Sequence, residues 1–149
     1  MNADNQKINA QYQTLLVLWF ALTVSQCLFV VLVFFTRPQL FRLDTSKPLL
    51  GSQPILVIAL GAASLAALAA SFVVEKRLLD QSVAQQNVGL VQQALIMSCA
   101  LCEAISMFGL FLAFTADYSY FFLFSGLGIL GAILHFPTRK NLLAASYKL

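Results

Sequence analysis

Long apolar stretches alternate with short polar ones along the chain, and this pattern predicts helices that cross a membrane. Residues 8–36, 48–74, 81–116 and 118–138 carry almost no charge, and only the third stretch contains a charged side chain, Glu103. Each stretch exceeds the roughly 18–20 apolar residues that a bilayer-spanning helix requires. We therefore expect an all-α, integral membrane four-helix bundle, a single membrane domain over 1–149 with spans at about 13–36, 54–74, 90–114 and 119–136.

Prolines mark the expected helix ends. The Arg37-Pro38 pair ends the first span, because proline restricts the residue before it and cannot continue the helical hydrogen-bond ladder. Pro54 stands in the first turn of the second span, where a helix tolerates proline. The segment 75–89 mixes apolar residues with charges and amides, so we expect the helix to extend beyond the membrane there.

Composition argues against two classes of function, a soluble enzyme and a nucleic-acid-binding protein. Hydrophobic residues make up 60% of the chain and charged residues 10%, against about 45–50% and about 25% in typical soluble domains. The spans leave too few residues for a soluble catalytic domain, and no catalytic motif is present, so we expect a protein that is not an enzyme. The net charge of +3 comes from scattered residues, which argues against nucleic-acid binding.

The short polar loops predict the orientation. Three basic residues, Arg37, Arg42 and Lys47, fall between the first two spans. Six lie on the other side: Lys7, Lys76, Arg77, Arg139, Lys140 and Lys148. By the positive-inside rule, both termini and the 75–89 connector are cytoplasmic, as expected for a bacterial inner (plasma) membrane protein.

Glu103 is the candidate functional residue, because it is the one ionisable side chain inside a predicted span and lies near its midpoint. A charge at that depth costs at least about 2.5–3.5 kcal/mol. Desolvation disfavours the charged form, so we expect a protonated acid that can bind and release a proton. The alternative is that a neutral Glu103 only holds helices together by a hydrogen bond.

A comparison of residue depths within the predicted spans suggests a partner for Glu103. The first and third spans run in the same direction, and Gln26 lies about as far past the midpoint of its span as Glu103 does. We therefore expect their side chains to be within direct or one-water hydrogen-bond reach. Ser25 and Ser106 would add hydroxyl groups to the same layer.

Small residues recur within the spans, where they allow helices to approach closely. The residues expected to serve helix packing are Gly61, Ser98, Cys102, Gly109 and Gly128.

The sequence around the acid, Ala100-Leu101-Cys102-Glu103-Ala104-Ile105-Ser106-Met107-Phe108-Gly109-Leu110, resembles the second helix of the proteolipid c subunit of rotary ATP synthases. The small-residue span before it resembles the first helix of the same hairpin, so that the likeness covers about residues 55–115, with an extra span on each side. The resemblance implies that Glu103 is the proton-carrying carboxyl, and that a proton fits the site better than sodium.

Other candidate sites are weaker. Cys99 and Cys102 have the spacing of a redox or metal pair, but cysteines in apolar helices commonly act as small hydrophobic residues, and we expect no metal. His135 is the lone histidine; an interfacial role is expected, with a haem or chlorophyll ligand as the alternative. No cofactor is predicted.

These observations favour a small membrane subunit in contact with the lipid bilayer, which forms a homo-oligomer or joins other membrane subunits. A membrane scaffold or assembly factor, in which Glu103 is structural, is the alternative. An independent transporter is disfavoured, because one intramembrane acid on unbroken helices offers little for substrate binding.

Overall fold

The computed structural model describes residues 3–42 and 48–146, and these residues form helices and connections without any strand. The all-α prediction is therefore confirmed. The elements are α1 (Ala3–Thr36), a 3-10 turn η1 (Pro38–Phe41), α2 (Pro54–Ala84), α3 (Val88–Thr115), α4 (Phe121–Leu134) and α5 (Arg139–Ser146).

Three of these helices, α1, α2 and α3, are long and apolar enough to cross a membrane. The fourth expected span is not one continuous helix. With 14 residues, α4 is about 21 Å long at about 1.5 Å per residue, short of the about 30 Å hydrocarbon core. Pro137 follows it and prevents a straight continuation, and α5 is bent from α4 by 47°. The described residues thus contain three helices that could span a membrane, or four candidate spans if α4 and α5 together form one broken span.

Local signals explain most of the helix ends. The first helix ends at Thr36, before the Arg37-Pro38 pair, and α2 begins at Pro54, both as predicted. Beyond the predicted second span, α2 continues to Ala84, so most of the 75–89 connector is helical. Asn87 caps α3 by accepting a hydrogen bond from the backbone N–H of Gly89 at 2.9 Å.

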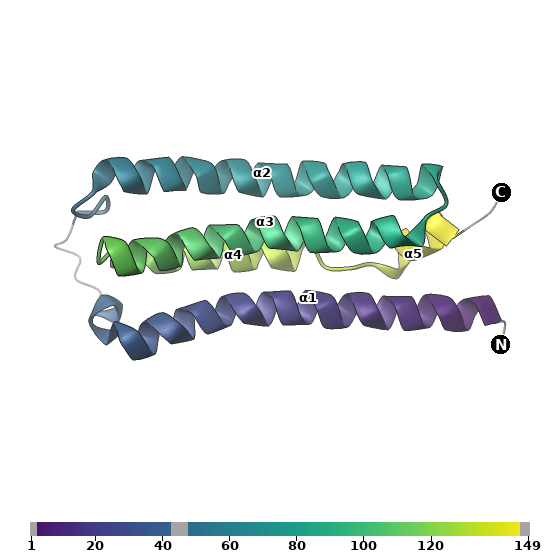
Figure 1. Ribbon diagram of the computed structural model, residues 1–149, viewed down its shortest axis with the longest axis horizontal. Coiled ribbons are helices and arrows are strands. Elements are labelled where there is room, and N and C mark those ends of the chain that lie inside the picture. Colours follow the sequence, from purple (N-terminus) through teal and green to yellow (C-terminus); the bar gives the residue numbers. More distant parts are fainter. Residues whose placement is uncertain (1–2, 43–47, 147–149) are drawn as a thin grey trace.

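The central helix is α3, which packs against α1, α2 and α4. Figure 1 shows α3 between α2 and α1, with α4 behind α3. The start of α1 and the whole of α5 lie at one end of the bundle, whereas η1 and the α3–α4 turn lie at the other. Within the described residues, α1 makes no extensive contact with α2.

The buried core has apolar ends and a polar middle. The cluster near η1 contains Val33, Leu40, Val57, Leu112, Ala113, Tyr118, Phe121 and Phe124. The cluster near α5 contains Leu15, Val91, Leu95, Cys99, Leu142 and Ala145. Between these clusters, Gln26, Ser64 and Ser106 are fully or almost fully buried. The candidate site lies in this polar middle layer.

Candidate functional site

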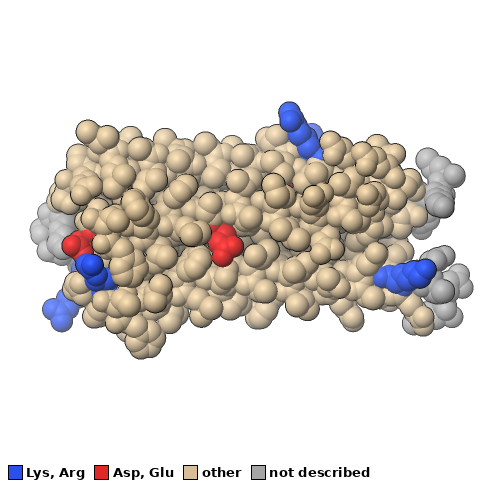
Figure 2. All heavy atoms as spheres, in the orientation of Figure 1, with Lys and Arg blue, Asp and Glu red and all other residues tan. Residues whose placement is uncertain are grey.

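Glu103 lies near the middle of α3 and is partly buried. Neighbouring positions on the same helix, among them Met97 and Met107, are exposed and apolar. Figure 2 shows an acidic side chain in the middle of a face that is otherwise made largely of uncharged residues. An acid in this setting lies between an exposed, largely apolar face and the helix bundle.

The hydroxyl of Ser25, on α1, contacts the carboxyl group. Ser25 Oγ lies 2.8 Å from Glu103 Oε1 and also 2.8 Å from the carbonyl oxygen of Leu22. A serine hydroxyl has one hydrogen to donate and lone pairs that accept. Ser25 can therefore donate to a carboxylate, or donate to Leu22 while accepting a hydrogen bond from a protonated Glu103.

Gln26 and Glu103, expected within direct or one-water reach, form direct hydrogen bonds to other partners. Gln26 is completely buried, and its Oε1 atom accepts a hydrogen bond from Ser106 Oγ at 2.8 Å. Its Nε2 atom has no partner among the described residues. The depth estimate placed the two helices correctly, but successive residues of a helix point about 100° apart. As a result Ser25, the neighbour of Gln26, faces Glu103.

Most of the small residues expected at helix contacts lie there. Ser98 and Cys102 are completely buried. A Cβ atom on Gly109 would lie 2.7 Å from the carbonyl oxygen of Phe121, and one on Gly128 would lie 2.6 Å from that of Cys102. In contrast, a Cβ atom on Gly61 would meet nothing within 4 Å, so no close packing within this chain explains that glycine.

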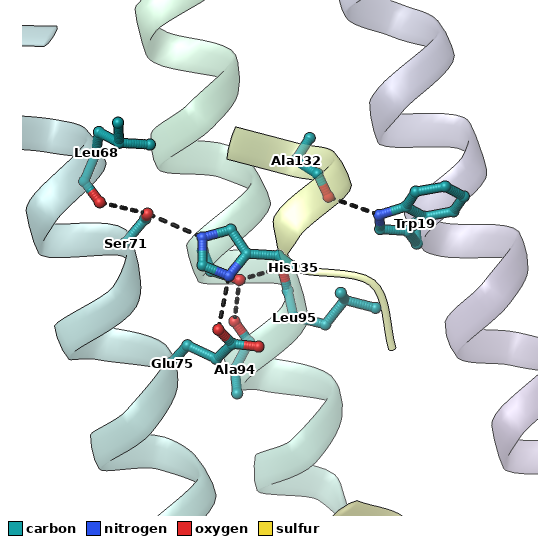
Figure 3. Close-up of polar contacts among 9 residues, drawn as sticks. Trp19, Leu68, Ser71, Glu75, Ala94, Leu95, Ala132 and His135 are labelled. Carbon is teal, nitrogen blue, oxygen red and sulfur yellow. Dashed lines mark hydrogen bonds and ion pairs between the residues drawn. The ribbon is translucent and has the colours of Figure 1, made fainter. Parts of the chain in front are cut away.

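A second polar cluster links α2 to the end of α4, and the sequence reasoning did not find it. His135, expected at the membrane interface, is 1% exposed and so is enclosed by the bundle. Its Nδ1 atom lies 2.6 Å from Glu75 Oε2, and its Nε2 atom lies 2.9 Å from Ser71 Oγ. Figure 3 shows the ring between these two side chains, both from α2. Glu75 directly follows the second predicted span and His135 lies at the end of the fourth, and both of these ends were predicted on the same side of the membrane. This shared position is the sequence signal that could have predicted their contact.

Within the described residues, the cysteines and the histidine do not gather into a group of three or more metal-binding side chains. No group of three or more His, Cys, Asp or Glu side chains able to hold a metal ion is found within 3–42 and 48–146. Cys27, Cys99 and Cys102 are free thiols. Both ring nitrogens of His135 contact protein groups.

At the opposite end of the bundle, a set of contacts joins the loops. Arg37 forms an ion pair with Asp117 and lies over the ring of Phe114, 5.7 Å from its centroid. Tyr118 donates a hydrogen bond to the carbonyl oxygen of Leu49 at 2.8 Å. Burial, and to a lesser extent the neighbouring Tyr120, raises the pKa of Tyr118 above its ordinary value of 10.0. These contacts hold the α3–α4 turn against the segment that precedes α2.

Comparison with known proteins identifies no relative: no family model, curated protein or solved structure matches the chain. The resemblance to the proteolipid c subunit therefore stays a prediction from the residues around Glu103. What the structure contributes is the antiparallel α2–α3 hairpin and the polar contacts of the acid.

Proposed function

We propose that this protein is a small, non-enzymatic integral membrane subunit in which Glu103 binds and releases a proton near the middle of the bilayer. The single observation that carries the proposal is the position of the Ser25 hydroxyl, 2.8 Å from both Glu103 Oε1 and the carbonyl oxygen of Leu22. One rotation of the hydroxyl group serves both protonation states of the acid.

In the proton-loaded form, Glu103 donates a hydrogen bond to Ser25 Oγ, and Ser25 donates to Leu22. When the proton leaves, the Ser25 hydroxyl turns and donates to the carboxylate. Hydrogen bonds to a charged group contribute more than those between neutral groups, about 1.5–3 kcal/mol against about 0.5–1.5 kcal/mol. The rotation of the Ser25 hydroxyl group therefore offsets part of the free-energy cost of an ionised Glu103 in hydrocarbon. An acid that exchanges its proton must pass through this ionised state.

The setting of Glu103 also favours an assembly. Its carboxyl group is partly exposed on an uncharged face, next to exposed apolar residues of α3 such as Phe111. Isolated acids seldom face lipid in the membrane core, so a second copy or another membrane subunit is expected to cover this face. We place the protein in a bacterial inner membrane with both termini cytoplasmic, on the distribution of basic residues.

Two measurements test the proton site in the intact, detergent-solubilised protein. A hydrophobic carbodiimide reacts with protonated carboxyl groups, so Glu103 should be labelled, and labelling should fall as the pH rises. Infrared difference spectra between low and high pH should show the C=O stretch of a protonated acid. Both signals should vanish in Glu103→Gln and persist in the control Asp117→Asn, which removes an exposed acid at the end of the bundle.

The proposal fails if Glu103 resists the carbodiimide at every pH and the C=O band is unchanged in Glu103→Gln. Mass analysis of the intact assembly in mild detergent then tests the second half of the proposal. A homo-oligomer, a partnered complex and a monomer differ in mass, and a monomer under conditions that preserve other membrane complexes contradicts a subunit role.

A membrane scaffold or assembly factor is the second candidate, and the Ser25–Glu103 hydrogen bond itself favours it, because the bond joins α1 to α3. Under this alternative, Ser25→Ala and Glu103→Leu should destabilise the bundle in a coupled way, whereas Glu103→Gln keeps an acceptor for Ser25 and should leave the assembly intact. Interhelical hydrogen bonds in membranes contribute about 0.6 kcal/mol on average and up to about 1.7 kcal/mol. A double-mutant cycle with a coupling in that range, together with no pH-dependent C=O band, would favour the scaffold.

A further inference from the structure

The pair of Glu75 and His135 is a buried ionisable site separate from Glu103. The side chain of His135 is 0% exposed and that of Glu75 is 24% exposed. Glu75 belongs to α2, and His135 directly follows the last residue of α4. The contact therefore holds the end of α4 against α2, two helices that otherwise share only a small interface.

The number of hydrogens available around His135 restricts the protonation state of its ring. Ser71 has one hydroxyl hydrogen, and its Oγ atom lies 2.7 Å from the carbonyl oxygen of Leu68, which can only accept. If that hydrogen points to Leu68, Ser71 Oγ can only accept at its contact with His135, so Nε2 must carry a hydrogen. Figure 3 shows Ser71 between Leu68 and the ring.

With Nε2 protonated, the 2.6 Å contact between His135 Nδ1 and Glu75 Oε2 requires one further proton. The proton lies either on the ring, next to a carboxylate, or on Glu75, next to a neutral ring. Both arrangements are neutral overall. Without that proton, the lone pair of Nδ1 would face a carboxylate oxygen inside the bundle, and an unmade hydrogen bond of a charged group is costly there.

Water can approach this pair from the end of the bundle where α5 lies. A cavity of about 10 Å³, at the lower limit for one water molecule, is lined by Glu75 and His135 and by Thr138 and Asn141 of the α4–α5 connection and α5. The titratable groups that act on His135 are Glu75 from α2 and Cys102 from α3. Of these two groups, Glu75 is the one whose side chain lies at hydrogen-bond distance from Nδ1.

We propose that Glu75 and His135 form a second proton-binding site, in which one proton is held between His135 Nδ1 and Glu75 Oε2 and exchanges with water through this cavity. Loss of the proton breaks the contact and releases the end of α4 from α2. The inference does not depend on Glu103, since no described contact joins the two clusters through hydrogen bonds.

The chain contains one histidine, so protein labelled with ¹⁵N-histidine gives the ring signals of His135 alone. Nuclear magnetic resonance at neutral pH should show Nε2 carrying a hydrogen and Nδ1 sharing a strong hydrogen bond. Raising the pH should change the Nδ1 signal and leave Nε2 protonated. A ring with a hydrogen on Nδ1 and none on Nε2 at neutral pH would overturn the proposal, as would a ring whose signals do not respond to pH.

Glu75→Gln removes the carboxylate and should lower the midpoint of the ring's titration by about 1–3 pH units, the shift expected for loss of a nearby opposite charge. Ser64→Ala is the matched control, because Ser64 is a buried serine of α2 that bonds only within its own helix, to Leu60 at 2.7 Å. An unchanged midpoint in Glu75→Gln refutes the shared proton. If Glu75→Gln does not fold, the pH titration of the His135 ring in the unmodified protein still tests the proposal. Glu103→Gln should leave that titration unaltered.

Discussion

Replacing Gly128 with alanine tests whether the missing side chain sets the separation of α3 and α4. A Cβ atom built on Gly128 would lie 2.6 Å from the carbonyl oxygen of Cys102 and 2.9 Å from Gln26 Oε1, and it would also collide with the hydroxyl of Ser106. The Cys102 oxygen belongs to the backbone of α3 and cannot rotate away. The two helices must therefore move apart, or the polar pair of Gln26 and Ser106 must break.

The expected cost follows from a comparison of two glycines in the same helix. Gly126 also lies in α4, but a Cβ atom there meets nothing within 4 Å. Both substitutions gain the same helix preference of alanine over glycine, about 0.5–1 kcal/mol. The difference between Gly128→Ala and Gly126→Ala is therefore the overpacking cost alone, about 1–3 kcal/mol.

Equilibrium unfolding in mixed micelles, with a denaturing detergent titrated against a mild one, gives the free energy of unfolding of each variant. Gly126→Ala should equal or exceed the unmodified protein, and Gly128→Ala should be less stable than Gly126→Ala by the amount above. Equal stabilities for the two variants would show that α3 and α4 are not in close contact at Gly128, and the arrangement of the polar layer would then be wrong.

Three further predictions follow from the contacts described. Gln26→Leu removes a buried amide nitrogen without a partner and should leave the free energy of unfolding within about 1 kcal/mol of the unmodified value or raise it; a loss of more than about 2 kcal/mol would contradict this. Tyr118→Phe should cost about 0.5–1.5 kcal/mol through its bond to Leu49. Because burial raises the pKa of Tyr118, the unfolded chain ionises first, so the unfolding free energy should fall as the pH rises above 10.0, and it should fall less steeply in the Phe variant. Reporter fusions at Leu149 and in the 37–53 loop should lie on opposite sides of the membrane. If both lie on the same side, the whole chain does not cross the membrane four times.

Signals that act over a few residues predicted the helix ends well. The prolines at 38 and 54 mark the end of α1 and the start of α2, because a missing N–H and a fixed φ angle operate wherever the chain goes. Pro137 likewise predicts the end of the fourth span, near residue 136. The helix before it ends at Leu134, and the following residues bend toward α5, which no apolar run in the sequence announces.

Contacts between helices were predicted only in part. Counting residues gives the depth of a side chain along its span, but not the direction in which it points around the helix axis. Counting residues from the span midpoints placed the layer of Glu103 and Gln26 correctly. Which side of each helix faces the other depends on how both helices pack against all their neighbours, and here it turned Ser25 toward the acid and Gln26 toward Ser106. His135 shows the same limit: its burial follows from where α4 ends, which its own sequence neighbours do not determine.

The lack of an extensive contact between α1 and α2 has a consequence for how the protein is made. In the membrane arrangement proposed above, helices enter in chain order, and α1 can pack only after α3, which begins 52 residues after the end of α1 (36 to 88), has arrived. During that interval α1 and α2 stand as separate helices in the lipid, as the two-stage view of membrane folding allows. The nascent chain thus has no compact intermediate until α3 is inserted, and a product interrupted after α2 would present two unassociated helices to membrane quality control.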